Sequence, residues 1–313
     1  SSLARGEGPD LFRIHNTWLP MFSQDLAPVS SETVSALNLS QNFYPSALRD
    51  LTKGNQYYGI PLEVDGLGLY VNEDIFKQAG LTYPTTWEEL RTTALKLTVK
   101  DSSGNILVGG VAMGKVNNVE HWSDILGLMM LQNGVDLSNP TGNLAEDALV
   151  YYTLFARTPD NTWDENQDNS ILAFAEGKVA MIFAPSWEAF EIKKISPERN
   201  FKILPVPQLP EVNLSWSSFW AEGVWNKSKN QAEAFEFLQY LGSKEVMSKL
   251  YAEEAKTRLF GEPYSRMDLG QGIAADPYAG AYVTQASNSQ SFYLSSRTFD
   301  NGINDKIIKY FED

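Results

Sequence analysis

The stretch YGIPLEVDGLGLYVNEDIFKQAG, residues 58–80, is the part of this sequence that says most about the fold. Alternating apolar residues in its first half predict a strand over Tyr58–Val64, and its second half has the spacing of a helix. Between the two halves stand two acids, Glu63 and Asp65, followed by two glycines. Neither charges nor glycines are typical of the interior of a buried strand. The stretch therefore raises the question of what surrounds the two carboxylates.

Length and composition limit the possible classes of protein. A chain of 313 residues is longer than one ordinary core needs, which predicts two domains. Lysine and arginine number 25 and aspartate and glutamate 39, so the formal net charge is −14. This charge repels nucleic acid and anionic lipid surfaces and is compatible with neutral or cationic ligands. There are no cysteines, which excludes disulfides and thiolate metal sites. The longest apolar stretch, near Ile125–Leu131, is too short to span a bilayer.

Strand and helix patterns alternate along the chain, which indicates an α/β fold. Asn72 is suited to cap a helix that Gly80 ends. Thr85 and Glu88 have the spacing of a capping box that starts the clearest helix. Further helices are expected over 121–131, 144–155, 231–241 and 244–251, and further strands over 11–14 and 106–113 and within GKVAMIFAP (177–185), NFKILPVPQLP (200–210) and SFWAEGVWNKSKN (218–230).

Few residues carry recognisable catalytic or metal-binding chemistry. Glu63 and Asp65 share a face of a strand and could act as the acid and base of a hydrolase. There are two alternative interpretations of these carboxylates. They could form a polar strand end at the surface, or they could lie on a rim that accepts hydrogen bonds from a ligand. Val71 stands where a dinucleotide loop needs glycine, and the calcium-like run 164–176 has Ala175 where such a loop needs glutamate. With two histidines and no serine in a nucleophile elbow, the sequence mildly disfavours an enzyme.

Aromatic residues are numerous, with 8 Trp, 14 Tyr and 16 Phe. For any one of them alone, a place in the core is the better interpretation. Together they suit a ligand site, because α/β folds bind ligands just beyond strand ends. Flat rings beside amides and carboxylates fit sugars, which have C–H faces and hydroxyl edges. The tryptophans at expected strand ends or turns are Trp18, Trp163, Trp187, Trp216, Trp220 and Trp225.

Four blocks of the sequence resemble those of a known family. They are ARGEGPDLFRIHNTWLP (4–20), YYGIPLEVDGLGLYVNEDIFKQAGLTYPTTWEEL (57–90), FAEGKVAMIFAPSWE (174–188) and NKSKNQAEAFEFLQYLGSKE (226–245). They are similar to the landmark blocks of the extracellular solute-binding proteins of ABC importers, and they follow one another in the family's order. Within the family, the resemblance is to the sugar-binding branch that includes maltose-binding proteins.

The resemblance implies an α/β, two-lobed periplasmic-binding-protein-like fold of type II with crossing hinge strands. A sugar or oligosaccharide would be held between the lobes and delivered to the permease subunits of an ABC transporter in the membrane. The protein would be a monomer with no cofactor, no metal and no nucleic-acid partner. It would lie in the periplasm or on the outer face of the cytoplasmic membrane, anchored by a lipid in the full-length protein. Lobe 1 would comprise 1–62 and 226–287, lobe 2 would comprise 66–222 and 290–313, and the hinges would lie near 63–65, 223–225 and 287–290.

The resemblance also implies which residues bind the ligand, and none of them is catalytic. Trp187 matches the position at which a tryptophan of maltose-binding proteins stacks on sugar. Glu63 and Asp65 would face the space between the lobes, because 62–66 matches the first crossing. The remaining candidates are His15, Asn16 and Trp18 from the segment after GPD, together with His121, Trp122, Trp220, Tyr293 and Arg297.

The chain departs from the family pattern at both ends. A strand–helix–strand unit of roughly 30 residues normally precedes the GEGPD block, and the family continues beyond the last helix, so N- and C-terminal family segments are missing. We therefore expect a partner segment to cover the strand 11–14, because unpaired strand edges invite aggregation. Two other functions stay open. One is a receptor for polyamines or quaternary amines, which aromatic boxes hold through cation–π contacts, and the less favoured one is a glycoside hydrolase that uses Glu63 and Asp65.

Overall fold

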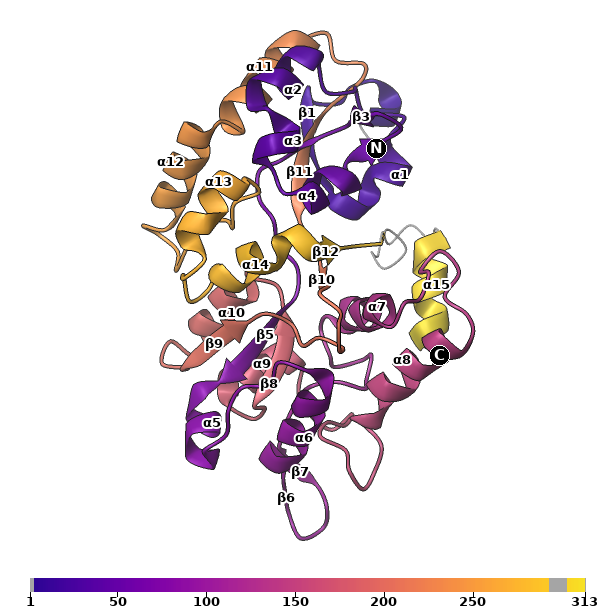
Figure 1. The fold of residues 1–313 in the computed structure, drawn as a ribbon, viewed down its shortest axis with the longest axis vertical. Coiled ribbons are helices and arrows are strands. Elements are labelled where there is room, and N and C mark those ends of the chain that lie inside the picture. Colours follow the sequence, from indigo (N-terminus) through magenta and orange to yellow (C-terminus); the bar gives the residue numbers. More distant parts are fainter. Residues whose placement is uncertain (1–2, 293–302, 313) are drawn as a thin grey trace. The chain divides into compact units, whose positions relative to one another are not determined.

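A computed structural model describes residues 3–292 and 303–312 of the chain. The chain divides into two compact units, which Figure 1 shows with the colours following the sequence. Unit 1 comprises Ser1–Gly66 and Ser217–Ser296, and unit 2 comprises Leu67–Trp216 and Arg297–Asp313. Each unit contains a three-stranded antiparallel sheet of its own.

The sheet of unit 1 has β11 at its centre, between β1 and β4. β11 and β1 pair along their whole length, and His15 at the end of β1 lies opposite Trp220 at the start of β11. This register brings two aromatic candidates together at one end of the sheet. The strands of unit 1 are β1 (Leu11–His15), β2 (Thr52–Lys53), β3 (Gln56–Tyr57), β4 (Ile60–Pro61), β11 (Trp220–Val224) and β12 (Ser289–Gln290).

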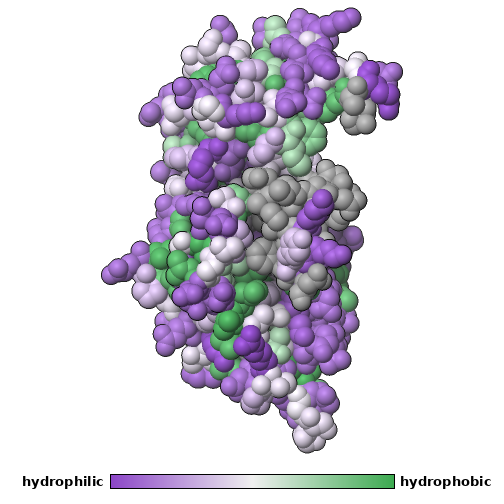
Figure 2. Space-filling view, turned by 90° about the vertical axis from the view of Figure 1, so that its right-hand side faces the viewer, coloured by the Kyte–Doolittle hydropathy of each residue, from purple (hydrophilic) through white to green (hydrophobic). Residues whose placement is uncertain are grey.

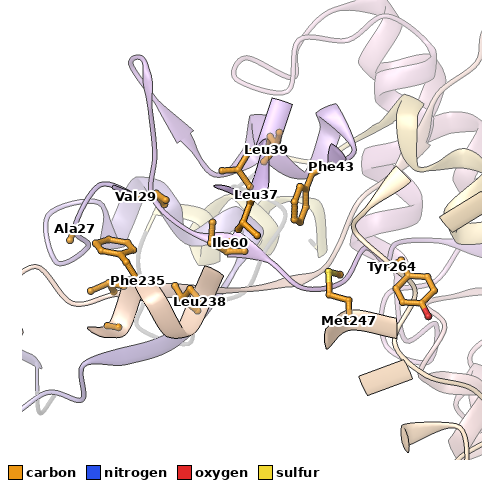
Figure 3. Packing of buried hydrophobic residues seen from close by; sticks show 13 residues of the cluster. Ala27, Val29, Leu37, Leu39, Phe43, Ile60, Phe235, Leu238, Met247 and Tyr264 are labelled. Carbon is orange, nitrogen blue, oxygen red and sulfur yellow. The ribbon is translucent and has the colours of Figure 1, made fainter. Parts of the chain in front are cut away.

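Helices from two segments far apart in the sequence build the core of unit 1. Figure 3 shows one buried apolar cluster, in which Leu37 and Leu39 contribute from α2 and α3 and Phe235 and Leu238 from α11. The burial of these side chains holds the two distant chain segments in one unit. The helices are α1 (Leu19–Phe22), α2 (Ser31–Leu37), α3 (Leu39–Asn42), α4 (Pro45–Asp50), α11 (Gln231–Leu241), α12 (Lys244–Glu254), α13 (Met267–Gly270) and α14 (Gly280–Gln285), with 3-10 turns η1 (Leu3–Arg5), η2 (Asn16–Trp18), η3 (Gln271–Ile273) and η4 (Ala286–Asn288).

The sheet of unit 2 has β5 at its centre, between β8 and β9. Every residue of β5 is buried, and the hydroxyl of Tyr70 donates to the carbonyl of Pro185 at 2.7 Å. This bond fixes the chain just beyond β8, two residues before Trp187. The strands are β5 (Gly68–Asn72), β6 (Val99–Lys100), β7 (Ile106–Val108), β8 (Met181–Ala184), β9 (Phe201–Leu204) and β10 (Ser215–Trp216), and the helices are α5 (Glu73–Ala79), α6 (Trp87–Leu97), α7 (Trp122–Gln132), α8 (Asn143–Leu154), α9 (Ser170–Glu176), α10 (Glu188–Ile195) and α15 (Ile303–Glu312).

The expected start of α6 is wrong by one residue. The capping box is made by Thr86 and Glu89, whereas the sequence predicted Thr85 and Glu88. Both pairs have the required spacing, and the Glu89 carboxylate also accepts from the backbone and hydroxyl of Thr85. The sequence did not predict α10 at all, although this helix carries Glu188.

Two strands are shorter than predicted, each for a local reason. Of the strand expected over 58–64, only Ile60–Pro61 pairs as β4, since Pro61 has no N–H to extend the ladder. Of the strand expected over 106–113, only Ile106–Val108 forms β7. At Gly110 the backbone passes so close to α6 that a Cβ would lie 1.9 Å from the Ala94 carbonyl oxygen. Beyond β7 the pairing continues only as an isolated parallel bridge between Gly109 and Val179 and a single bond from the N–H of Ala112 to the carbonyl of Met181.

Among the described residues, the unit boundaries differ from the expected lobes at Gly66 and over residues 217–222 and 290–292, which lie in unit 1. The reason for the difference over 217–222 is that β11 pairs with both β1 and β4, and so belongs to the sheet of unit 1. The hinges, and the motion of one lobe against the other, stay predictions.

Figure 2 shows one face of the molecule, on which hydrophilic residues predominate and apolar residues form smaller groups between them. Within residues 3–292 and 303–312, no helix combines the length and the apolar character that crossing a membrane requires.

Candidate functional site

In unit 1, three of the predicted ligand-binding residues form one aromatic cluster. The ring centroids of His15 and Trp220 are 5.2 Å apart, and those of Trp18 and Trp220 are 5.3 Å apart, both edge to face. His15 and Trp18 are 6.1 Å apart. All three side chains are partly exposed. The pairing of β1 with β11 therefore brings together aromatic rings from two segments that lie far apart in the sequence.

Hydroxyl groups hold the imidazole of His15 in this cluster. Its Nδ1 lies 2.7 Å from Oγ1 of Thr17, and its Nε2 lies 3.0 Å from Oγ of Ser218. Burial lowers the pKa of His15 to about 4. His15 is therefore an uncharged ring at neutral pH, and it packs against the two tryptophans as such.

Asn16 lies behind the cluster and is 1% exposed. Its Nδ2 donates to Oδ2 of Asp50 at 2.8 Å and to Oγ of Ser291 at 3.1 Å. Its Oδ1 accepts from the backbone N–H of Phe219 at 3.1 Å. The buried amide thus ties η2 to α4 and to the entry of β11, and the role of Asn16 as a ligand contact stays a prediction.

The two acids of residues 58–80 have different surroundings. Oε1 of Glu63 accepts from the backbone N–H of Trp220 at 3.2 Å. Burial, together with a hydrogen bond to Glu262 and the repulsion of that carboxylate, raises the pKa of Glu63 well above its usual range. Asp65 is 7% exposed, and its Oδ1 accepts from the backbone N–H of Gly66 at 2.7 Å. Glu63 therefore favours the neutral carboxyl form, whereas Asp65 is held against the backbone.

Arginines accompany the carboxylates of unit 1. Nε of Arg13 donates to Oε1 of Glu222 at 2.7 Å across the β1–β11 pair. Nη1 of Arg258 donates to Oε1 of Glu262 at 2.8 Å. The Glu262 carboxylate that raises the pKa of Glu63 is thus itself engaged by an arginine.

In unit 2, Trp187 follows β8 and is the residue that precedes the first turn of α10. Its side chain is 38% exposed, in contrast to the buried strand before it. Its indole lies edge to face with the imidazole of His121, with ring centroids 6.1 Å apart and an interplanar angle of 75°. The sequence predicted the exposure of Trp187 at a strand end, but it did not predict the helix that starts there.

Carboxylates surround His121. Its Nε2 lies 3.0 Å from Oε1 of Glu188 on α10. Burial lowers the pKa of His121, but the hydrogen bond to Glu188 and the charges of Glu188, Asp124 and Glu120 together raise it above its usual value. Burial raises the pKa of Asp124 to about 6, and its Oδ1 accepts from Nε1 of Trp216 at 3.0 Å. Glu188 was not among the residues that the sequence predicted for the site. The one feature of the sequence that could have pointed to it is its position next to Trp187.

The other tryptophans are mostly core residues. Trp122 is 5% exposed at the start of α7, where it lies next to His121 and does not present its ring to solvent. Trp163 is fully buried and donates from Nε1 to Oδ1 of Asn118 at 2.9 Å. Trp216 and Trp225 are 2% and 5% exposed. Of the six tryptophans expected at strand ends or turns, Trp18, Trp187 and Trp220 are the partly exposed ones. Tyr293 and Arg297 lie outside the described residues.

Unit 2 also contains a cavity of about 190 Å³, lined by Trp87, Met129, Asn133, Asp147, Ala148, Tyr151 and Leu209. No predicted ligand-binding residue lines it. Among residues 3–292 and 303–312, no group of three or more histidine, aspartate or glutamate side chains is arranged to hold a metal ion. In the calcium-like run, Asp168 instead pairs with Lys178 at 3.0 Å.

Comparison with known proteins gives a consistent assignment. A family model described as bacterial extracellular solute-binding protein matches residues 1–248. A putative binding protein of Brucella abortus (strain 2308) is 23% identical over 264 residues, which are 81% of this chain and 63% of that protein. The chain thus spans less than two thirds of the length of this curated relative.

Two solved structures share the fold. An ABC transporter solute-binding protein of Thermotoga lettingae, bound with α-D-tagatose, has a TM-score of 0.74 at 21% identity, covering 99% of this chain and 85% of that one. A cyclo/maltodextrin-binding protein complexed with maltotetraose has a TM-score of 0.73 at 18% identity, covering 93% and 74%. The match of the family model over most of the sequence and the shared two-lobed α/β fold lead to one conclusion: this chain belongs to the family of bacterial extracellular solute-binding proteins.

Proposed function

We propose that this chain is the receptor of an ABC importer, which binds a sugar or oligosaccharide without altering it and delivers it to the permease subunits in the membrane. The observation that carries the proposal is the partly exposed indole of Trp187, held edge to face against His121 at the start of α10. An indole in this position offers a flat apolar face to a pyranose ring. In unit 1, Trp18 and Trp220 are two further indoles that are partly exposed and lie edge to face with each other.

The names of similar proteins support a carbohydrate as the ligand. The Thermotoga lettingae protein holds a monosaccharide, and the cyclo/maltodextrin-binding protein holds a tetrasaccharide. At identities of 21% and 18% they do not specify which sugar this chain binds. The length of the ligand is therefore part of what the experiment below measures.

The charges of the candidate residues favour a neutral ligand over a polyamine or quaternary amine. A receptor for cations needs ionised carboxylates beside its aromatic rings. Glu63 favours its neutral form, because burial and Glu262 raise its pKa. Next to Trp187, the Glu188 carboxylate is already engaged by the imidazole of His121 at 3.0 Å.

The arrangement also disfavours a glycoside hydrolase based on Glu63 and Asp65. Such an enzyme needs one protonated and one ionised carboxyl group on either side of the bond that it cleaves. The Asp65 carboxylate is 7% exposed and accepts from the N–H of Gly66, so it faces its own backbone. The hydrogen-bond partner that raises the pKa of Glu63 is Glu262, which Arg258 engages, while Asp65 acts on Glu63 through its charge alone.

The family supports a location for this chain, and its anchoring and assembly are part of the proposal. Its members are extracellular, and we place this chain outside the cytoplasmic membrane. Attachment of the full-length protein by a lipid, a monomeric state and the binding of ligand between the two lobes are further parts of the proposal.

Isothermal titration calorimetry with maltotetraose, D-tagatose and spermidine tests the proposal. We expect one of the two sugars to bind and spermidine not to bind. Chromatography of the sugar after incubation with the protein should return it unchanged, and a melting temperature that rises with sugar concentration should accompany binding. Cleaved maltotetraose would favour the hydrolase, and binding of spermidine alone would favour the cation receptor.

A further inference from the structure

We infer that His121 and Glu188 are positioning residues for Trp187, and that the positive charge of His121 makes the orientation of the indole, and with it sugar binding, dependent on pH. The first part concerns unit 2 by itself. The second part rests on the proposed function, because it needs the sugar as a readout.

The positions of the three residues in their helices support this role. Trp187 and Glu188 are consecutive, at the residue before α10 and at its first residue. His121 occupies the same place before α7. The Glu188 carboxylate reaches the imidazole at 3.0 Å, and the indole lies against the same imidazole at 6.1 Å between centroids. One ring therefore links the starts of two helices, and Glu188 fixes that ring from the residue adjacent to the tryptophan.

Exposure separates the supporting pair from the tryptophan. The side chains of His121 and Glu188 are 14% and 12% exposed, whereas Trp187 is 38% exposed. A buried ion pair adds little net stability, and its best-attested benefit is to define one arrangement of the groups around it. Because the indole is more exposed than the pair, its contact with the imidazole of His121 is the constraint on its orientation that we propose.

The charges around His121 make this constraint sensitive to pH. The groups that act on His121 are Glu188 on α10, Asp124 on its own helix α7, and Glu120 in the segment just before it. All three are acids, and together they outweigh the effect of burial, which is why the pKa of His121 is raised. An imidazolium ring attracts an aromatic partner more strongly than a neutral ring does. The contact with Trp187 is therefore strongest below the pKa of His121 and weakens as pH rises through it.

The only other histidine of the sequence is an internal control. His15 also lies edge to face with a tryptophan, Trp220, but it is held by the hydroxyls of Thr17 and Ser218. Its pKa is lowered to about 4. A histidine that contacts a tryptophan without a carboxylate partner thus stays neutral over the range in which His121 titrates.

Proton NMR of the ligand-free protein tests the inference directly. Two histidines give two Hε1 signals, which His121→Gln assigns, and Trp187→Phe assigns the indole N–H signal of Trp187. We expect the His121 signal to titrate above its usual pKa of 6.5 and the indole signal of Trp187 to move with the same midpoint. The His15 signal should stay constant over this range.

The variant Glu188→Gln removes the carboxylate and keeps the shape of the side chain. We expect the midpoints of His121 and of the Trp187 indole to fall together, because the largest attraction on the imidazolium is lost. The matched control is Glu245→Gln, which removes the same charge from an exposed pair with Lys249 on α12. This control should leave both midpoints unchanged.

Calorimetry with the sugar that binds more tightly, maltotetraose or D-tagatose, extends the test to function. Affinity should fall about threefold between about pH 6 and about pH 9, the size of a cation–π contact at a partly exposed site. The fall should be absent in His121→Gln. An indole signal that ignores the titration of His121 would overturn the inference even if sugar binds. An indole that follows His121 in a protein that binds neither sugar would uphold the positioning role and overturn the proposed function.

Discussion

Unit 1 and unit 2 each place one histidine edge to face with a partly exposed tryptophan, yet the two histidines differ in charge. In unit 1, His15 contacts Trp220, its partners are hydroxyls, and burial lowers its pKa to about 4. In unit 2, His121 contacts Trp187, its partner is Glu188, and its pKa is raised although it is buried. The chemical nature of the hydrogen-bond partner decides the charge here, because burial acts in the same direction on both rings.

The difference has consequences of opposite sign for stability. Between about pH 6.5 and 4, native His15 is neutral while the unfolded chain binds a proton, so the free energy of unfolding falls as the pH falls. Native His121 keeps its proton above the usual pKa of 6.5, so its contribution is complete below that value and is lost as pH rises through the raised pKa. His15 thus lowers the free energy of unfolding at acid pH, and the loss of the proton of His121 lowers it at higher pH.

The largest expected effect is that of His15→Gln on acid stability. A shift from 6.5 to about 4 corresponds to about 3 kcal/mol lost on acidification. The variant cannot be protonated at this position and should lack that part of the loss, which urea denaturation at a series of pH values measures. His121→Gln is the control and should retain the acid loss. Identical acid slopes in His15→Gln and the wild type would show that His15 is not the responsible group.

Trp187→Ala should weaken sugar binding by about 2 kcal/mol, which is about thirtyfold in dissociation constant. The melting temperature of the ligand-free protein should change little, because the side chain is 38% exposed. Calorimetry with the bound sugar and differential scanning calorimetry measure the two quantities. If affinity is kept while the ligand-free protein melts several degrees lower, Trp187 is a packing residue and unit 2 does not present a sugar platform there.

Ser218→Ala tests whether a hydroxyl is a sufficient partner for a buried, neutral histidine. It removes the 3.0 Å contact of Oγ with Nε2 of His15 and should cost about 1 kcal/mol of unfolding free energy at neutral pH. Because no charge is involved, the cost should be the same at pH values on either side of neutrality. Denaturant melts at two pH values measure it, and a cost that grows as pH falls toward about 6 would contradict the neutral assignment of His15.

Arg13→Gln should have the smallest effect on the free energy of unfolding. It compares the Arg13–Glu222 pair of unit 1 with the His121–Glu188 pair of unit 2. The Arg13 side chain is 60% exposed in its pair with Glu222, so its loss should cost about 0.5 kcal/mol or less. The guanidinium does not titrate in the accessible range, so the cost should be independent of pH. Chemical denaturation near pH 6 and pH 9 measures this, with Glu188→Gln as the variant whose cost should change between them.

Local sequence determined the elements whose signals lie within a few residues. The spacing of apolar residues predicted α11 over Gln231–Leu241, which is the helix observed. Asn72 caps α5, and Gly80 ends it with a φ of 66°, a conformation that glycine adopts without strain. The family was also visible in the sequence, because its four blocks are runs of neighbouring residues.

Only the tertiary structure decided which aromatic residues face solvent and which histidine carries a charge. Trp163 and Trp187 both follow polar or turn-like segments in the sequence, but Asn118, 45 positions from Trp163, engages its buried indole, whereas Trp187 stays 38% exposed. The partners of the histidines are equally remote, with Ser218 lying 203 positions from His15 and Glu188 lying 67 positions from His121. Burial and pKa depend on what packs against a side chain in space, and windows of neighbouring residues do not contain that information.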